Sequence, residues 1–428
     1  MLNVTNKVNQ TNRRTWLKSA TAASAAVAFP TIIPASALGR GGAVAPSERI
    51  VLGGLGIGPR GTVDLKCFLA NSDVQFVAIA DLQKSRREAV KVLVDETYGN
   101  KDCVLYQDMY DVLGRQDIDA LLIATGDRWH TMASVLAAKA GKDVYCEKPC
   151  SLTIAESRAL ADGYRKYNRV YQAGTQRRTI GNFEFAKNLV RDGKLGKLHT
   201  IHANTRPPGT SHHWLPAEPE PPAIVCDWDR WLGPCPWRPY NSEYVRGRWR
   251  FHFDFHGGGI LEWGSHTVDL CQWAAGKDNT APVQYIPNAD GVECIYEDGL
   301  KLVMRSEGWM GMGTCSVRYE GDEGWIETGD SGNFILNPES LRTQQSVFNR
   351  AGTDPTTHIR NFLDCVKTRE LTNANAAVVA QSHVVCHAAY IAWQLGRKLT
   401  FDPATEKFSG DEEANRMCSR AMREPWHV

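Results

Sequence analysis

Between residues 49 and 146, short apolar runs alternate with helical stretches, and this alternation constrains the fold more than any other feature of the chain. The apolar runs cover residues 49–55, 74–80, 120–124 and 143–146. Runs of this length without polar alternation are typical of parallel strands covered on both faces. Since helices separate them, the pattern predicts an α/β fold with a doubly wound parallel sheet.

A glycine-rich turn follows the first predicted strand. Gly56, Gly58 and Gly61 form a Gly-x-Gly-x-x-Gly pattern that opens a helix, and Asp81 ends the second strand. The glycines allow close backbone approach, and the helix N-terminus presents amide groups to a pyrophosphate. Asp81 can accept hydrogen bonds from a ribose diol, which favours NAD in a Rossmann domain. NADP remains an alternative, because three nearby basic residues could bind its 2′-phosphate: Lys84, Arg86 and Arg87.

Beyond residue 178 the pattern becomes that of a mixed α+β domain. Short alternating strands are expected at residues 198–203, 300–305 and 324–328. They predict an open, mostly antiparallel sheet with one covered face. A long irregular segment, residues 207–255, is dense in Pro, Trp and Arg, and loops of that length are usually functional.

We therefore expect four parts. They are a leader (1–37), a Rossmann NAD(P)-binding domain (46–175), a sheet domain for substrate binding and oligomerisation (176–345), and a C-terminal helical region packing back on the fold (346–428). The last part contains one long helical stretch, residues 357–395. A chain of 428 residues is long enough for two domains behind a leader.

The leader has the order of an export signal. Arg13 and Arg14 precede an Ala/Ser-rich apolar run, and Ala35-Ser36-Ala37 supplies a cleavage site. Paired arginines favour the twin-arginine route and a periplasmic location, with an uncleaved membrane anchor as the alternative. A formal net charge of +1 produces no overall electrostatic field that would attract nucleic acid or an acidic membrane. The expected partner is a small molecule.

Twelve cysteines are scattered without a Cys-x-x-Cys or zinc-ligand pattern. A protein folded before export forms its core with reduced thiols, so most should be small buried residues, with a Cys226–Cys235 bridge left open. His252 and His256 are spaced as a histidine pair on a helix, but no matching Cys or carboxylate pattern accompanies them. We therefore predict no metal site.

Two motifs carry chemistry. Lys148, in a Glu-Lys-Pro step, ends a parallel strand, where ligands bind in doubly wound sheets. It could stabilise an alkoxide, or be an ordinary exposed lysine. Glu262, His266 and Asp269 lie on one face of a mostly apolar helix after three glycines. His266 could accept a hydroxyl proton while Glu262 or Asp269 orients its ring, or the group could be structural.

On these motifs the chain resembles the glucose–fructose oxidoreductase / inositol dehydrogenase / rhizopine catabolism (Gfo/Idh/MocA) family over essentially the whole mature chain. The resemblance implies that Lys148 and His266 act at the reacting carbon. The family usually has Asp four residues before the histidine, where this chain has Glu262, the third expected catalytic residue. Further positions expected at the cofactor or at the border of the cleft are Thr125, His130, Glu147 and Arg177.

The tryptophans and histidines of the irregular segment, Trp214 among them, could form platforms for sugar rings or a structural arm against a neighbouring subunit. Export adds a constraint, because no NAD pool is expected outside the cytoplasm. We therefore expect a tightly bound nicotinamide, a sugar or polyol substrate (with Asp269, Arg177 and Trp214 contacting it) and a homo-oligomer. The alternatives are a redox-assisted glycoside hydrolase, in which the same Lys and His would serve, and a non-catalytic sugar-binding relative.

Overall fold

The computed structural model describes residues 44–206, 209–343 and 352–427. The predicted twin-arginine leader, residues 1–37, lies outside them. A short 3-10 turn, η2 (Pro46–Glu48), belongs to an N-terminal unit, Met1–Arg49. Everything described below belongs to a second unit, Ile50–Val428.

The first part of this unit is the predicted parallel sheet. Its six strands run in the order β3-β2-β1-β4-β5-β6, and every pair is parallel. The strands are β1 (Ile50–Leu55), β2 (Val74–Ala80), β3 (Val104–Tyr106), β4 (Ala120–Ile123), β5 (Asp143–Cys146) and β6 (Tyr171–Ala173). The order reverses between β1 and β4, which opens a crevice at their carboxyl ends.

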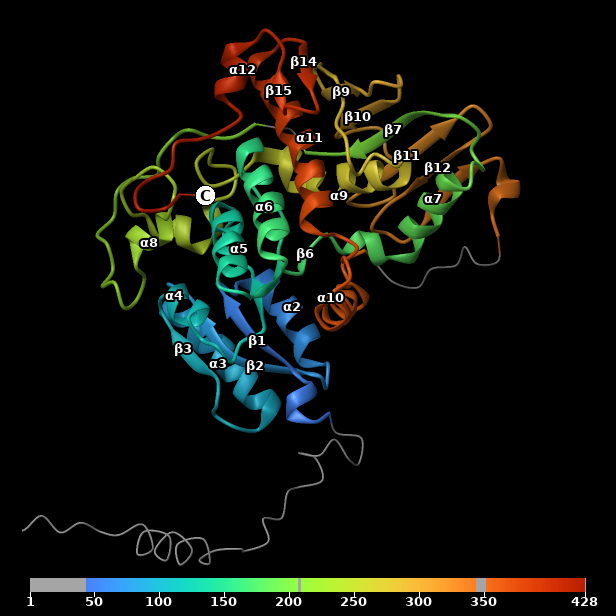
Figure 1. The fold of residues 1–428 in the computed structure, drawn as a ribbon. Helices are drawn as coiled ribbons and strands as arrows, with labels where there is room; N and C mark the ends of the chain where they lie inside the picture. Colours follow the sequence, from blue (N-terminus) through green and yellow to red (C-terminus); the bar gives the residue numbers. More distant parts are fainter. Residues whose placement is uncertain (1–43, 207–208, 344–351, 428) are drawn as a thin grey trace, which may run out of the picture. The chain divides into compact units, whose positions relative to one another are not determined.

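Helices cover both faces of this sheet, as its apolar strands require (Figure 1). They are α2 (Pro59–Leu69), α3 (Lys84–Tyr98), α4 (Met109–Leu113), α5 (His130–Lys139) and α6 (Ile154–Tyr167). Successive residues of β4 enter different cores: Leu122 packs with the cluster under α2 and α3, and Leu121 with the cluster under α5 and α6. The doubly wound prediction is confirmed.

The second part is a nine-stranded sheet, in the order β13-β12-β11-β7-β10-β9-β8-β14-β15. Only β7 and β10 pair in parallel, so the sheet is mostly antiparallel, as predicted. Its strands are β7 (Leu198–Asn204), β8 (Gln284–Pro287), β9 (Gly291–Ile295), β10 (Lys301–Arg305), β11 (Val317–Gly321), β12 (Trp325–Thr328), β13 (Phe334–Asn337), β14 (Leu399–Asp402) and β15 (Lys407–Phe408). Three helices pack on it: α7 (Gly181–Arg191), α9 (Gly258–Ala275) and α11 (Ala376–Leu395).

The C-terminal region differs from the single helical stretch expected over residues 357–395. It forms two helices, α10 (Thr356–Thr368) and α11, because Arg369 adopts a left-handed conformation (φ 65°) and Asn375 caps the start of α11. It also adds β14 and β15 to the nine-stranded sheet before the short helix α12 (Glu412–Arg416). In the described part of the chain, α11 alone has the length and hydropathy of a membrane span, and 83% of its most apolar window is buried, as in a core helix.

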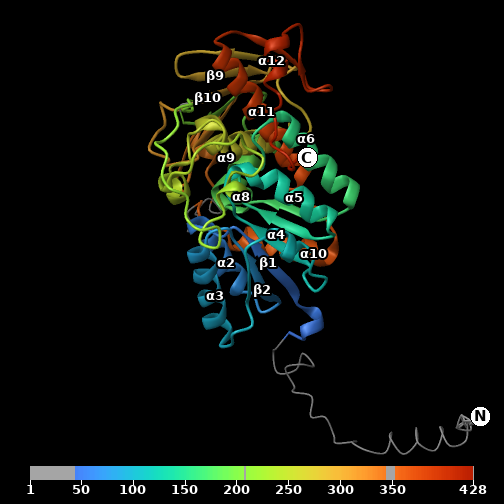
Figure 2. The same cartoon turned by 90° about the vertical axis from the view of Figure 1, so that its left-hand side faces the viewer.

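The irregular segment folds into what we call the strap, residues 209–256. It contains only the short helix α8 (Trp228–Leu232) and a π-helical turn, η5 (Tyr244–Arg248). Its buried rings form a small core of their own, made of Trp228, Trp231, Tyr244, Trp249 and Phe255. Figures 1 and 2 both place α8 beside α4 and α5 of the parallel sheet. These rings therefore pack within the chain, whereas Trp214 and Trp237 of the same segment stay exposed.

All twelve cysteines lie in the described residues, and each is a free thiol. Ten are buried, as expected of small core residues. Cys226 and Cys235, the pair considered for a bridge, are both free and buried within the strap.

Candidate active site

The glycine-rich turn forms a backbone cradle at the end of β1. Gly56 has a φ of +64°, and a Cβ atom there would lie 2.4 Å from the side chain of Thr125. Gly58 is the N-cap of α2. A Cβ on Gly61 would lie 2.5 Å from that of Ala124, so this glycine lets the helix pack tightly on β4. These are the roles that a dinucleotide-binding turn requires of its three glycines.

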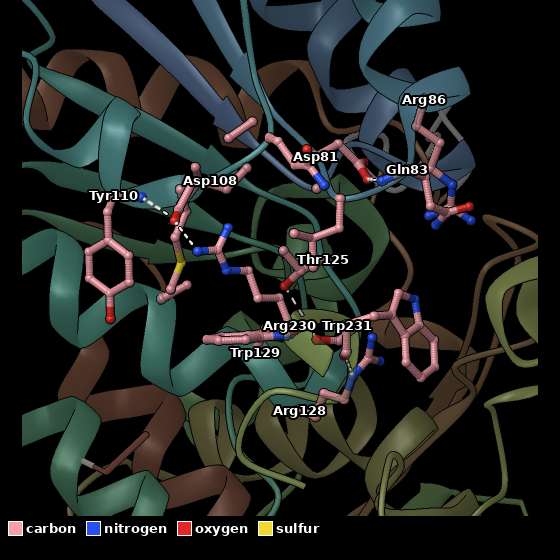
Figure 3. A pocket seen from close by; sticks show the side chains of 18 of the residues that line it. Asp81, Gln83, Arg86, Asp108, Tyr110, Thr125, Arg128, Trp129, Arg230 and Trp231 are labelled. Carbon is pink, nitrogen blue, oxygen red and sulfur yellow. Dashed lines mark hydrogen bonds and ion pairs between the residues drawn. The ribbon is translucent and has the colours of Figure 1, made fainter. Parts of the chain in front are cut away.

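Asp81 lies in a cavity beside this turn (Figure 3). Its Oδ1 accepts a hydrogen bond from the Gln83 amide at 2.8 Å, while its buried Oδ2 has no partner among the described residues. Burial, which outweighs Arg86 and Arg87 nearby, raises the pKa of Asp81 to about 6. An unpartnered carboxylate oxygen in a cavity is suited to accept hydrogen bonds from ligand hydroxyls.

Two of the three basic residues near Asp81 are held by the strap. Arg87 donates to the carbonyls of Asp81 (2.9 Å) and Ile224 (2.7 Å), and Arg86 Nη2 donates to the carbonyl of Val245 (3.3 Å). Lys84 forms an ion pair with Glu88 one helical turn away. Since both guanidinium groups hydrogen-bond to strap carbonyls, a phosphate beside Asp81 would have to compete for them.

The strap also closes the side of this cavity. The Lys84 amide donates to the carbonyl of Val225 at 2.9 Å, next to an isolated bridge between Gln83 and Cys226. Arg128 lies 3.5 Å above the ring of Trp231 and donates to its carbonyl at 2.6 Å. Burial lowers the pKa of Arg128 to about 10, and its Nη1 has no partner among the described residues.

A larger cavity of about 450 Å³ adjoins the first and shares Arg86, Thr125 and Gly126 with it. Most predicted site residues line it: Gly58, Gly61, Thr125, His130, Glu147, Lys148, Arg177, Glu262 and His266. Gly56 and Asp81 line the first cavity. Asp269 and Trp214 line neither. The fold thus brings the cofactor turn, the Glu-Lys-Pro step and helix α9 to one continuous cleft.

Lys148 is tied to helix α9. Its Nζ donates to the carbonyl of Glu262 at 3.0 Å and to Oε1 of the same residue at 3.2 Å. Glu262 Oε2 lies 3.0 Å from Nε2 of His256. Burial raises the pKa of Glu262, but the charge of Lys148 and the hydrogen bond from His256 outweigh burial and lower this pKa far below its usual range. Glu262 is therefore ionised and holds the ammonium group in the cleft.

His266 is buried, and both of its ring nitrogens have defined partners. Arg177 Nη1 lies 3.0 Å from Nε2, and because guanidinium groups only donate, Nε2 accepts. The Nδ1 proton is then available to Thr175 Oγ1, 3.3 Å away. Burial and the charges of Arg177 and Lys148 lower the pKa of His266 well below its usual value, so the ring is neutral.

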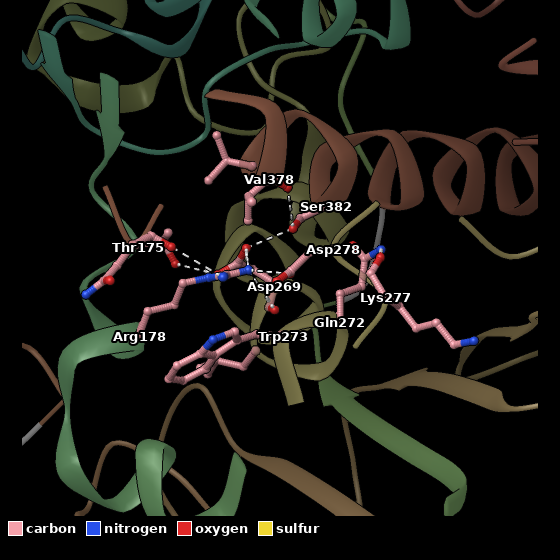
Figure 4. A network of polar contacts seen from close by, with 12 residues as sticks. Thr175, Arg178, Asp269, Gln272, Trp273, Lys277, Asp278, Val378 and Ser382 are labelled. Atoms are coloured by element: carbon pink, nitrogen blue, oxygen red, sulfur yellow. Dashed lines mark hydrogen bonds and ion pairs between the residues drawn. The ribbon is translucent and has the colours of Figure 1, made fainter. Parts of the chain in front are cut away.

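Asp269 is a structural residue (Figure 4). It is completely buried, and Arg178 binds both of its oxygens, at 2.7 and 2.8 Å. Ser382 on α11 donates to Oδ1 at 2.8 Å, and Thr175 Oγ1 donates to Oδ2 at 3.4 Å. This geometry corrects the expectation of a substrate contact, because no oxygen of Asp269 reaches the cleft. The expected contact with the His266 ring is indirect and runs through Thr175.

Glu147 and His130 make supporting contacts. Glu147 Oε1 accepts from Arg60 Nε at 3.2 Å, and Arg60 also binds Asp64 at 2.8 Å. Burial and the adjacent Glu147 charge raise the pKa of Asp64 well above its usual value. His130 lies 2.6 Å from the carbonyl of Pro149 and 3.1 Å from that of Thr125, so it ties two cleft loops together.

Three further residues belong to the site: Arg60, Asp127 and His256. Arg60 lies inside the glycine motif and Asp127 lies in the loop after β4. Their positions in the chain pointed to the site, but their residue types did not. The ligand atoms of Asp127, His256 and Glu262 all lie within 4.8 Å of one another, a spacing that a metal ion could also bridge. Only the fold brings these three together, since residues 127 and 256 are far apart in the chain.

The chain is similar to known oxidoreductases. A family model described as "Oxidoreductase family, NAD-binding Rossmann fold" matches residues 49–175, and one described as "Oxidoreductase family, C-terminal alpha/beta domain" matches residues 209–428. Among curated relatives, the myo-inositol 2-dehydrogenase of Thermotoga maritima is 29% identical over 157 residues, 37% of this chain and 45% of the relative. Inositol 2-dehydrogenase 1 of Saccharopolyspora erythraea is 31% identical over 176 residues, 40% and 48% of the two chains. The chain thus spans about half the length of these relatives.

Solved structures share the fold. The myo-inositol 2-dehydrogenase of Lactobacillus plantarum superposes with a TM-score of 0.58 at 18% identity, covering 83% of this chain and 100% of that one. The WlbA dehydrogenase of Bordetella pertussis, solved with NADH and UDP-GlcNAcA, gives 0.61 at 16% identity, with 83% and 99% covered. One family model covers more than half of the chain, and the other covers its dinucleotide turn. The chain therefore belongs to the Gfo/Idh/MocA oxidoreductase family.

Proposed function

We propose that this protein is an NAD-dependent oxidoreductase that acts on a secondary hydroxyl of a sugar or polyol. The observation that carries the proposal is the convergence of Lys148 and His266 on one cavity that is continuous with the glycine turn of the Rossmann sheet. The inositol dehydrogenases among its relatives support the substrate class.

The residues present fit a dinucleotide. The unpartnered Oδ2 of Asp81 would accept from the adenosine ribose, and the amide groups at the start of α2 would hold the pyrophosphate. Arg86 and Arg87 are already bound to strap carbonyls, which favours NAD over NADP. Bound NAD supplies the acceptor for the carbon-bound hydrogen and its electron pair.

Lys148 and His266 then divide the remaining chemistry. Lys148 donates to the substrate hydroxyl oxygen and stabilises the negative charge that develops on it. His266 Nε2 takes the hydroxyl proton, since its ring is neutral. Because Arg177 occupies this nitrogen at 3.0 Å, the substrate hydroxyl must displace that hydrogen bond. The products are a carbonyl group, a reduced nicotinamide and a proton, which His266 passes on because its pKa is low.

Tight retention of the cofactor is part of the proposal. The strap accepts hydrogen bonds from two Rossmann elements that border the adenosine cavity: Val225 accepts from Lys84 of α3, and Trp231 accepts from Arg128 in the loop after β4. These contacts hold the strap beside a nucleotide in this cavity, which would slow its release. Net turnover would then couple two sugars on one bound nicotinamide, oxidising one and reducing the other.

The test is the nucleotide content of the purified protein. Absorbance and fluorescence spectra before and after denaturation, with mass identification of the released compound, should reveal about one NAD(H) per chain. Sugars are then screened by the appearance or bleaching of the bound NADH signal. Protein that purifies empty and binds NAD weakly would contradict tight retention, and release of NADP would contradict the assignment of Asp81.

We also infer export by the twin-arginine route and assembly into a homo-oligomer. The support for export is the order of charge, apolar run and cleavage site in residues 1–37. Replacing Arg13 and Arg14 by lysine should leave the full-length protein in the cytoplasmic fraction. Light scattering on the mature protein would determine its assembly, and a monomer would contradict the second inference.

A further inference from the structure

A second hollow adjoins the cleft on the side of the strap. It has a volume of about 580 Å³, and Gly247 and Arg250 line both it and the catalytic cavity. Its remaining wall includes Trp214, Arg248, Phe251 and His252. The hollow is therefore an extension of the site that holds Lys148 and His266, reached across the turn at Gly247.

Two aromatic rings are exposed at this hollow. Trp214 is 55% exposed and Phe251 is 40% exposed, whereas Trp228, Trp231 and Trp249 of the same strap are buried. Phe251 adopts a left-handed conformation, with φ +65°, which costs energy for a bulky residue and turns the chain at this point. Exposed rings beside a polar cavity are the usual platform for the C–H faces of a sugar.

The polar side chains of the hollow are accessible to a ligand, because Arg248 and Arg250 are exposed. Neither the Arg248 nor the Arg250 guanidinium makes an ion pair with any described residue. His252 is only 8% exposed, and its Nδ1 has no hydrogen-bond partner within the described ranges. The described lining contains no carboxylate, which argues against a cation. Such a surface suits a ligand rich in hydroxyl oxygens.

We propose that this hollow is a second saccharide subsite. The substrate is then a glycoside of at least two sugar units, with the reacting unit between Lys148 and His266 and the linked unit stacked on Trp214. This inference rests on the proposed function, because it takes the cleft at Lys148 as the reacting centre. It narrows the substrate class from any sugar or polyol to a disaccharide or longer chain.

The test compares matched substrates on the holoenzyme. Bound-nicotinamide turnover is measured with glucose, galactose and galacturonate, and with maltose, cellobiose, lactose and digalacturonate. We expect at least one disaccharide to exceed its monosaccharide tenfold or more in kcat/KM. The Trp214→Ala and Arg248→Ala variants should reduce this preference ratio at least tenfold. Preference for digalacturonate alone would identify an acidic sugar as the occupant.

Trp237→Ala is the matched control. Trp237 belongs to the same strap and is 56% exposed, but it lines neither cavity, so its replacement should leave the ratio unchanged. Equal kcat/KM for every monosaccharide and disaccharide pair, or an unchanged ratio in Trp214→Ala, would overturn the subsite. If no sugar is turned over, the proposed function fails separately. Calorimetric binding of the same disaccharides, lost in Trp214→Ala, would still support the subsite, and absence of binding would refute it.

Discussion

The backbone amide of Gly258 donates a hydrogen bond to Nδ1 of His256 at 3.0 Å. Because Nδ1 accepts, the proton of the neutral ring lies on Nε2. This N–H donates a hydrogen bond to Glu262 Oε2 at 3.0 Å. A metal ion at Asp127, His256 and Glu262 would need the lone pair of that nitrogen. The arrangement therefore favours a donor role for His256, which orients Glu262 and, through it, Lys148.

His256→Ala should lower kcat by about 100-fold while the cofactor stays bound, because Glu262 would no longer hold Lys148 in one position. The measurement is steady-state turnover together with the nucleotide content of the variant. His199→Ala, an exposed histidine on β7, is the control. Metal analysis of the wild type provides a separate check, since a stoichiometric bound cation lost in His256→Ala would refute the donor role.

Lys148→Ala and His266→Ala should each reduce kcat/KM by about 100-fold to 10,000-fold, the range for loss of a positioned acid or base. Released-nucleotide analysis should still find NAD in both variants. Lys139→Ala, an exposed lysine at the end of α5, controls for the loss of a positive charge. Near-normal turnover in both variants would remove the catalytic assignment and favour a sugar-binding protein.

The affinity for NAD should depend on pH through Asp81. Burial raises the pKa of this carboxyl to about 6 in the free protein, and ribose hydroxyls bind the ionised form better. Affinity should therefore be full well above pH 6 and should fall below it, by at most about tenfold per pH unit. The measurement is the dissociation constant for NAD of the cofactor-free protein, determined at several pH values between pH 5 and 8, a range that brackets the pKa of about 6.

Asp81→Asn is the informative variant for the same site. It should bind NAD weakly with little pH dependence. It should also unfold at a higher temperature than the cofactor-free wild type, because holding a buried ionised Asp81 above pH 6 costs about 3 kcal/mol. An unchanged pH profile in Asp81→Asn would show that another group titrates.

The buried ion pair between Arg178 and Asp269 should matter for stability and not for substrate contact. Asp269→Ala leaves the buried Arg178 guanidinium with Asp278 as its remaining carboxylate partner, and should destabilise the protein by up to about 3–5 kcal/mol. Ser382→Ala removes only a hydroxyl hydrogen bond to the same carboxylate and should cost about 1 kcal/mol. Denaturant unfolding compares the two. Equal, small losses would argue against a structural role for Asp269.

Local sequence determined most of the Rossmann part. β2 (Val74–Ala80) begins and ends where the run of apolar residues predicted, and the glycine turn lies where its motif stands. Short strands such as β3 and β6 were not predicted, because three residues carry too little periodicity. The break between α10 and α11 was also missed, because both helices share an apolar pattern and the left-handed Arg369 gives no sequence signal.

The sequence by itself thus determined the fold class, the cofactor turn and the identity of Lys148 and His266 as candidates. Only the tertiary structure decided which carboxylate pairs with which basic residue. Glu262 lies 114 positions from Lys148 and Asp269 lies 91 positions from Arg178, and such pairs form only when helix α9 packs against the parallel-sheet part of the chain. Helical spacing places Glu262 and Asp269 near one helix face, but it carries no information on which side opens to the cleft and which is buried.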